Sequence, residues 1–249
     1  MYLKTIQAMG IKSLFEVLQA VLNDVNVIFG PSGIKVIALD TARVSLVNVF
    51  LDASNFEEYS FDREVIAGMN MNNVYKLLKT ITVNDVLTIR LTEADFIEFH
   101  IQNADKKTKS TFKLKLMDID DDLLEMPDIN MTIETTLPSL DFQRVCRDMG
   151  NIAKEITMTR NGKTFTVSCE GDFASQSTEI ACNDDTADDR ECSGTYSLKY
   201  INLFTKATTM CSNLQIIQER PDLPIVFKYN VANLGDIQFY LAGKSITSD

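Results

Sequence analysis

Few residues of this chain are of the types that perform acid–base or metal chemistry. His100 is the only histidine, and no partner for general-base catalysis is evident beside it. The run Asp118-Ile119-Asp120-Asp121-Asp122 groups carboxylates, which bind hard cations such as Ca²⁺. It lacks the glycine at the sixth position of a calcium-binding loop, and its pattern is typical of a solvated connector. We therefore predict no catalytic residue, metal or cofactor, although an enzyme remains the competing class.

Cysteine usage and hydropathy indicate the compartment. The five cysteines are odd in number and form no C-x-x-C pair, so neither a disulfide framework nor a zinc site is expected. No apolar run approaches the roughly 18 residues that a membrane span needs, and Met1–Gly10 lacks the pattern of a secretory signal. We expect an intracellular protein in a reducing compartment.

Basic residues recur at helical spacing in a chain whose net charge is −11. The net charge taken alone argues against a nucleic-acid partner. Much of the acid, however, lies in two stretches, Asp118–Asp128 and Asp184–Glu191, that are typical of solvated loops. The basic residues gather on one face of each predicted helix: Lys12, Lys76, Lys79, Arg144, Arg147, Lys199 and Lys206. From spacing alone, solvated helix faces are the simpler interpretation.

The secondary-structure elements that must position these residues occur in two similar copies along the sequence. The segment Ser13–Val27 has an apolar face at helical spacing, and it recurs about 128 residues later as Leu140–Ile152. Val74–Lys79 is likewise repeated as Ile201–Lys206. Each copy also holds many short strands rich in β-branched and aromatic residues. We predict an α+β fold, with helices on one face of antiparallel sheets. The predicted domains are 1–116 and 131–249, joined by a connector at 117–130.

Five short motifs, in the same order along the chain, resemble those of the eukaryotic DNA sliding clamp, the proliferating cell nuclear antigen family. They are Leu39-Asp40-Thr41-Ala42-Arg43-Val44-Ser45-Leu46-Val47, Leu114-Lys115-Leu116-Met117-Asp118-Ile119-Asp120, Cys146-Arg147-Asp148, Phe204-Thr205-Lys206-Ala207-Thr208 and Phe239-Tyr240-Leu241-Ala242. The resemblance implies a ring of three subunits around duplex DNA, with helices lining the hole. The seven basic residues would then meet phosphates in a sequence-blind, salt-weakened contact. It also implies a polymerase, other replication and repair proteins and a separate clamp loader as partners, in the nucleus or a viral replication compartment.

The resemblance implies that the ring closes through sheet edges. Thr111–Met117 of one subunit would pair with about Thr178–Cys182 of the next. Backbone hydrogen bonds would set the geometry and apolar side chains would supply burial. The residues assigned to this interface are Phe112, Leu114, Thr178 and Ile180. For Phe112, the core of its own domain is an equal alternative.

The resemblance further implies a pocket for a short peptide of the form Gln-x-x-aliphatic-x-x-aromatic-aromatic, the PIP box. The matching positions are Leu39, Arg43, Val44, Leu124, Met126, Pro127, Met131, Pro224, Tyr240, Leu241, Ala242, Gly243 and Lys244. Such a set can form aliphatic walls with an adaptable methionine. Plain hydrophobic core is the alternative, above all for Val44 and Leu241. Arg43, Met131 and Gly243 stand where relatives usually carry histidine, tyrosine and proline, so we expect an altered pocket.

Two other non-enzymatic functions stay open at this level. One is a clamp-fold processivity factor that grips DNA as a monomer, and the other is one subunit of a heterotrimeric ring. A monomer loses its hold on linear DNA steeply as salt rises, whereas a loaded ring on circular DNA resists salt because its link is topological.

Overall fold

The computed structural model describes residues 1–93, 95–103, 105–120, 124, 134–162, 164–181, 191–220 and 222–244. Within these ranges, no helix has the length and hydropathy that a membrane crossing requires. Contacts divide the chain into two compact units. Unit 1 contains residues 1–41, 47–126 and 230–237, and unit 2 contains residues 42–46, 127–229 and 238–249.

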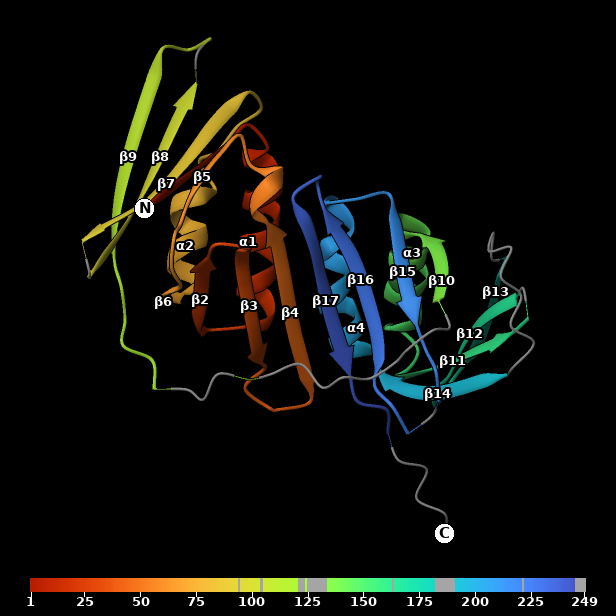
Figure 1. Ribbon diagram of the computed structural model, residues 1–249. Helices are drawn as coiled ribbons and strands as arrows, with labels where there is room; N and C mark the ends of the chain where they lie inside the picture. Colours follow the sequence, from red (N-terminus) through yellow and green to blue (C-terminus); the bar gives the residue numbers. More distant parts are fainter. Residues whose placement is uncertain are drawn as a thin grey trace. The chain divides into compact units, whose positions relative to one another are not determined.

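Unit 1 combines two antiparallel sheets with two α-helices (Figure 1). In chain order its elements are β1 (Tyr2–Thr5), α1 (Ala8–Val21), β2 (Asp24–Gly30), β3 (Gly33–Leu39), β4 (Ser45–Asp52), the short 3₁₀ turn η1 (Ala53–Asn55), β5 (Glu58–Ser60), β6 (Val65–Asn70), α2 (Met71–Leu78), β7 (Asp85–Glu93), β8 (Phe96–Asn103) and β9 (Thr108–Lys115). The strand orders are β5-β1-β7-β8-β9 and β4-β3-β2-β6. Helices α1 and α2 contact each other.

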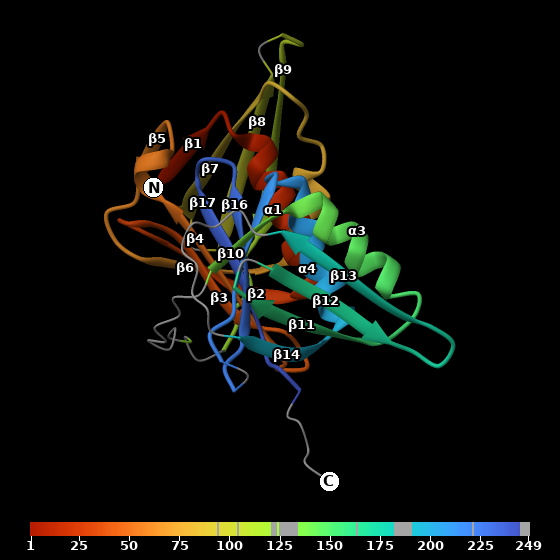
Figure 2. The same cartoon turned by 90° about the vertical axis from the view of Figure 1, so that its right-hand side faces the viewer.

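Unit 2 repeats this plan. Its elements are β10 (Glu134–Pro138), α3 (Ser139–Met149), β11 (Glu155–Asn161), β12 (Thr164–Glu170), β13 (Ser175–Ala181), β14 (Cys192–Ser197), α4 (Leu198–Phe204), the 3₁₀ turn η2 (Thr205–Thr209), β15 (Asn213–Ile217), β16 (Ile225–Val231) and β17 (Gly235–Leu241). The strand orders are β10-β15-β16-β17 and β13-β12-β11-β14. Helices α3 and α4 contact each other, and Figure 2 shows β12 and β13 as a hairpin at the margin of unit 2.

The matching strand orders confirm the α+β fold and the internal duplication. β1, β7, β8 and β9 of unit 1 correspond to β10, β15, β16 and β17, and β4-β3-β2-β6 corresponds to β13-β12-β11-β14. The two glycines of the repeated turn lie in equivalent hairpins, with positive φ angles of 142° at Gly33 and 54° at Gly162. Glycine reaches such angles without strain, which explains its recurrence at this turn.

Apolar side chains at helical and alternating spacing build a separate core in each unit. In unit 1, Ile11, Leu14 and Leu18 of α1 are buried and share an apolar core with residues of β2 to β4. In unit 2, the rings of Phe204 and Phe239 stack with their centroids 4.6 Å apart. Buried aromatic pairs of this kind add about 0.5–1.5 kcal/mol beyond their area burial. Each core fixes two helices against the sheets.

The first helix begins earlier than the prediction. The repeated segment with the helical apolar face starts at Ser13, whereas α1 spans Ala8–Val21. Leu22 is extended at φ −120° and ψ 153°, and from Val25 the buried residues alternate along β2. The β-branched and aromatic residues of Val25–Phe29 predict this strand, which pairs with β6.

Candidate functional site

The helices carry a charge opposite to that of the whole chain. The four α-helices of the described residues, with Lys79 at the C-cap of α2 and the turn η2, hold seven basic and three acidic residues, although the chain carries −11. Six of the seven predicted basic residues are exposed, namely Lys76, Lys79, Arg144, Arg147, Lys199 and Lys206. Such local positive potential attracts phosphates when net charge does not.

Helix α3 shows how the basic face arises. Phe142, Cys146 and Met149 are buried at i, i+4 and i+7, which leaves Arg144 and Arg147 on the solvent side. Each arginine lies near an acid on its own helix, with Arg144 Nη1 3.7 Å from Asp141 Oδ1 and Arg147 Nε 3.9 Å from Asp148 Oδ1. Exposed pairs of this kind contribute at most about 1 kcal/mol. A phosphate can therefore displace the carboxylates.

Lys12 differs from the other six basic residues. Its side chain is half-buried, and its Nζ donates a hydrogen bond to the carbonyl oxygen of Ile81, 2.8 Å away. Ile81 follows α2, and its own N–H donates to the Leu78 carbonyl at 3.0 Å. Lys12 thus ties α1 to the end of α2 as well as carrying charge. Spacing could not reveal this contact, because the two residues are far apart in the chain.

The predicted interface residues lie on the outermost strands of two sheets. β9 is the last strand of its sheet and β13 is the last strand of another, within the part of the chain that the structure describes. Phe112 lies opposite Phe99, and Ile180 lies opposite Phe165. The edge residues Phe112, Leu114, Thr178 and Ile180 are half-buried, whereas Phe99 and Phe165 are 1% and 0% exposed. Each edge therefore leaves part of its core-facing side uncovered.

Two predicted pocket residues of unit 2, Val44 and Ala242, are joined by a backbone hydrogen bond. The Ala242 N–H donates to the Val44 carbonyl at 3.3 Å, and the Lys244 N–H donates to the Thr195 carbonyl at 2.9 Å. The Lys244 ammonium also pairs with Glu155. Arg43 is exposed with a positive φ of 55°. These bonds hold the segment after β17 beside the segment before β4.

The remaining predicted pocket residues differ in burial, and some of them lie outside the described residues. Leu241 is fully buried, as the core interpretation expects, and Pro224, Tyr240 and Gly243 are half-buried. In unit 1, Leu39 and Leu124 are exposed apolar side chains. Met126, Pro127 and Met131 lie outside the described residues.

The start of the connector is fixed to unit 1, a feature that the sequence did not reveal. The Met117 N–H donates to the Gly68 carbonyl at 2.8 Å, and Asn26 Nδ2 donates to the Ile119 carbonyl at 3.1 Å. A Cβ atom on Gly68 would lie 2.3 Å from the Met117 oxygen, closer than van der Waals contact permits. Glycine is therefore required where this segment crosses β6.

A polar cluster shapes the loop after α2. Asp85 is buried and accepts hydrogen bonds from the Thr82 N–H at 2.7 Å and from Asn103 Nδ2. Burial raises the pKa of Asp85, but these hydrogen bonds outweigh it, so the net pKa lies below the ordinary 3.8. The ionised carboxylate thus holds the loop beside the β8–β9 hairpin.

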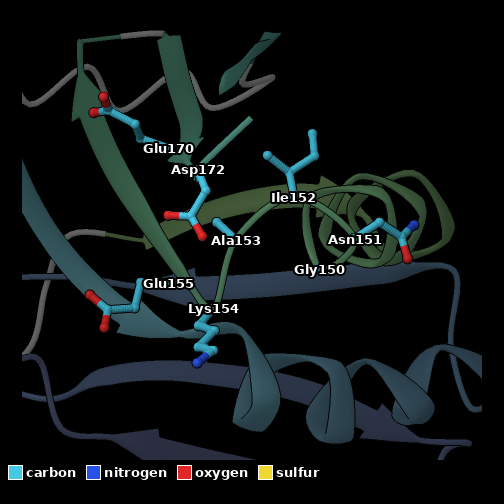
Figure 3. A pocket seen from close by; sticks show the side chains of 9 residues that line it. Gly150, Asn151, Ile152, Ala153, Lys154, Glu155, Glu170 and Asp172 are labelled. Carbon is cyan, nitrogen blue, oxygen red and sulfur yellow. The ribbon is translucent and has the colours of Figure 1, made fainter. Parts of the chain in front are cut away.

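His100, the histidine considered for catalysis, has polar neighbours on two strands. His100 contacts Thr111 Oγ1 and Glu98 Oε2, each at 3.0 Å, on the surface of the sheet. Within the described ranges, no group of three or more histidine, cysteine or acidic residues could hold a metal ion. A cavity of about 410 Å³ lies between α3 and the β12–β13 turn (Figure 3). Glu155, Glu170 and Asp172 line it with Lys154, so its acidic wall does not suit a phosphate.

Comparison with known proteins covers nearly the whole chain. The family model for the N-terminal domain of proliferating cell nuclear antigen matches residues 1–124, and the model for its C-terminal domain matches residues 125–244. A chlorella virus protein, the probable DNA polymerase sliding clamp 1 of Paramecium bursaria Chlorella virus 1, is 36% identical over 255 residues. The match spans 97% of this chain and 95% of that relative.

Proposed function

Because this chain belongs to the proliferating cell nuclear antigen family and is a DNA polymerase sliding clamp, we propose that three copies close into a ring around duplex DNA. The helices α1 to α4 of each copy line the hole, and the sheets form the outside. This proposal rests on one observation. The helices carry seven basic and three acidic residues, although the net charge of the chain is −11.

The exposed basic residues bind phosphates without reading bases. Lysine and arginine contacts to the backbone carry no sequence information, and they weaken as salt rises because the release of bound counterions then becomes less favourable. The acids beside Arg144 and Arg147 compete with phosphates and keep each contact short-lived. A ring that is held by topology can slide along DNA because its individual contacts are weak.

The exposed sheet edges support the way the ring closes. β9 and β13 are the outermost strands of their sheets within the described residues, and their core-facing side chains Phe112 and Ile180 are half-buried. An unpaired edge of this kind is suited to backbone pairing with another strand. We therefore assign an antiparallel pairing to β9 of one copy and β13 of the next.

The client site belongs to the region around Val44 and Ala242. A peptide with an aliphatic and two aromatic side chains would bury them against apolar residues there, and the connector would cover it. The bond between Val44 and Ala242 and the bond between Lys244 and Thr195 support this assignment, since they preform one wall. The exposed Arg43 favours peptides with acidic flanks. Polymerases, other replication and repair proteins and the clamp loader are the proposed partners.

The clamp itself catalyses no reaction in this proposal, and loading uses the ATP of a separate loader. Membership of the sliding clamp family supports this view. The proposed location is the site of DNA replication, in the nucleus or in a viral replication compartment.

The absolute mass in solution tests the ring. Light scattering on a sizing column, at several concentrations and two salt levels, should give about 84 kDa, three times the 28.0 kDa chain. A persistent species of 28.0 kDa would refute the homotrimer and favour a monomeric factor or a heterotrimer subunit.

Encirclement needs a second measurement. Linear duplex DNA with free ends should retain the trimer only transiently, while the same DNA with both ends blocked after threading should retain it through a high-salt wash. A protein that grips DNA from one side would leave both DNAs equally at high salt.

A further inference from the structure

The edge strand β9 carries positive charge only. Lys109, Lys113 and Lys115 alternate with the core-facing Phe112 and Leu114, so the three lysines share the solvent face of the strand. All three are exposed, and β9 contains no acidic residue. The Lys113 ammonium lies 4.3 Å from the centre of the Phe96 ring, which holds its stem against the sheet.

The edge strand β13 carries the opposite charge. Glu179 is its only charged residue, and it is exposed. Glu179 alternates with Thr178 and Ile180, which face the core opposite Val167 and Phe165. The neighbouring strand β12 has one further charge, Glu170, and no basic residue. This edge therefore presents a negative charge on the face that corresponds to the lysine face of β9.

The period of two along a strand limits how these edges can meet. Suppose that β9 extends the sheet of β13 and that the core-facing sides of the two strands point the same way. The solvent-facing residues of β9, which lie an odd number of positions from Phe112, must then lie opposite the solvent-facing residues of β13. Every such antiparallel register near full overlap places Glu179 opposite one lysine of β9, or opposite Thr111 with Lys109 and Lys113 diagonally beside it. Diagonal neighbours on one face lie within reach of long side chains.

From this juxtaposition we propose that the β9 lysines and Glu179 form the charge code that selects the subunit interface, so that β9 of one copy accepts only β13 of another. This inference rests on the ring proposed above. Pairing of two β9 edges would set lysines against lysines, which blocks dimers through like edges. The charges therefore direct head-to-tail assembly, which closes into a ring.

The location of these charges supports this role. Complementary charges occur on β9 and β13, the two edge strands that must pair with a separate molecule in the proposed ring. Selection against wrong partners is a known use of charge at protein interfaces.

Charge reversal tests the code. Glu179→Lys should raise the concentration for half-dissociation of the trimer about tenfold or more at 50 mM salt. One of the substitutions Lys109→Glu, Lys113→Glu and Lys115→Glu, added to the same chain, should restore most of the trimer stability. Glu134→Lys is the matched control, since it makes the same change at an exposed position of β10, in another sheet. It should leave the trimer unchanged. At 500 mM salt the difference between Glu179→Lys and the wild type should shrink.

The outcomes separate this inference from the ring itself. A wild-type chain that is monomeric at all concentrations would refute the ring. A trimeric wild type with an equally stable Glu179→Lys trimer would refute the charge code alone, and so would weakening that none of Lys109→Glu, Lys113→Glu and Lys115→Glu reverses. The unfolding temperatures of Glu179→Lys and Glu134→Lys should match that of the wild type when compared as monomers, because both side chains are exposed.

Discussion

Replacing Lys12 separates its structural role from its role in binding DNA. Lys12→Met removes the ammonium group, retains a similar apolar stem, and leaves the Ile81 carbonyl without the donor that lies 2.8 Å away. That carbonyl follows the C-terminal end of α2, where a positive charge is also favourable to the helix dipole.

The expected destabilisation follows from the geometry of this bond. A hydrogen bond from a charged donor contributes about 1.5–3 kcal/mol, and because Lys12 is half-buried we expect a loss at or below the lower end of that range, about 1–2 kcal/mol. For a chain of this size the change lowers the unfolding temperature by about 2–8 °C. Lys76→Met, at an exposed position of α2, removes the same charge and should change stability by less than about 0.5 kcal/mol.

Thermal and urea unfolding of the two variants, together with DNA retention at several salt concentrations, check this reasoning. Lys76→Met should reduce the slope of log affinity against log salt, by up to about 0.9 for each phosphate that the variant no longer neutralises. Lys12→Met should reduce it less, since its ammonium already serves Ile81. Equal unfolding temperatures for both variants would refute the structural role of Lys12.

Three further substitutions probe other parts of the clamp. Asp85→Asn should lower the free energy of unfolding by about 1–2 kcal/mol at pH 7. Because the pKa of Asp85 in the folded state lies below 3.8, the wild type should lose this advantage as pH falls below about 4. If urea unfolding gives the same stability difference between the two proteins at pH 7 and at pH 3, the idea is wrong. Gly68→Ala places a Cβ 2.3 Å from the Met117 oxygen, so it should displace the connector and weaken binding of a fluorescent PIP-box peptide; unchanged anisotropy titrations would contradict this. Phe112→Ala should lower the trimer mass at low micromolar concentration without unfolding the monomer, and an unchanged mass would count against its place in the interface.

Patterns that are local in sequence predicted the fold well. Apolar spacing identified the four helices, and the alternation of strands with the repeated glycine turn identified the duplicated α+β architecture. The start of α1 was predicted too late, because the repeated segment begins at Ser13 whereas the helix begins at Ala8. The strand over Val25–Phe29 was predicted correctly from its β-branched and aromatic residues.

The site was less accessible to sequence reasoning, for two physical reasons. Spacing placed Lys76, Arg144 and Arg147 on exposed faces correctly, since exposure depends on the period of their own helix. The bond from Lys12 to Ile81 and the crossing of Met117 over Gly68 arise between segments far apart in the chain, so no local pattern reports them. The position of β9 and β13 at sheet edges also depends on the complete strand order.

The charge distribution of the chain makes ring closure more important than it would be for a basic DNA-binding protein. A free subunit carries −11, and beyond the Debye length of about 8–10 Å salt screens the attraction between DNA and the helix lysines and arginines. Their attraction acts only once duplex DNA already lies against α1 to α4. An open ring would therefore depart from DNA quickly at physiological salt, whereas a closed ring cannot depart without breaking an edge. In the proposed ring, the time that the clamp stays on DNA would be set by the lifetime of the β9–β13 pairing, and the charges of Glu179 and the β9 lysines would affect processivity without touching DNA.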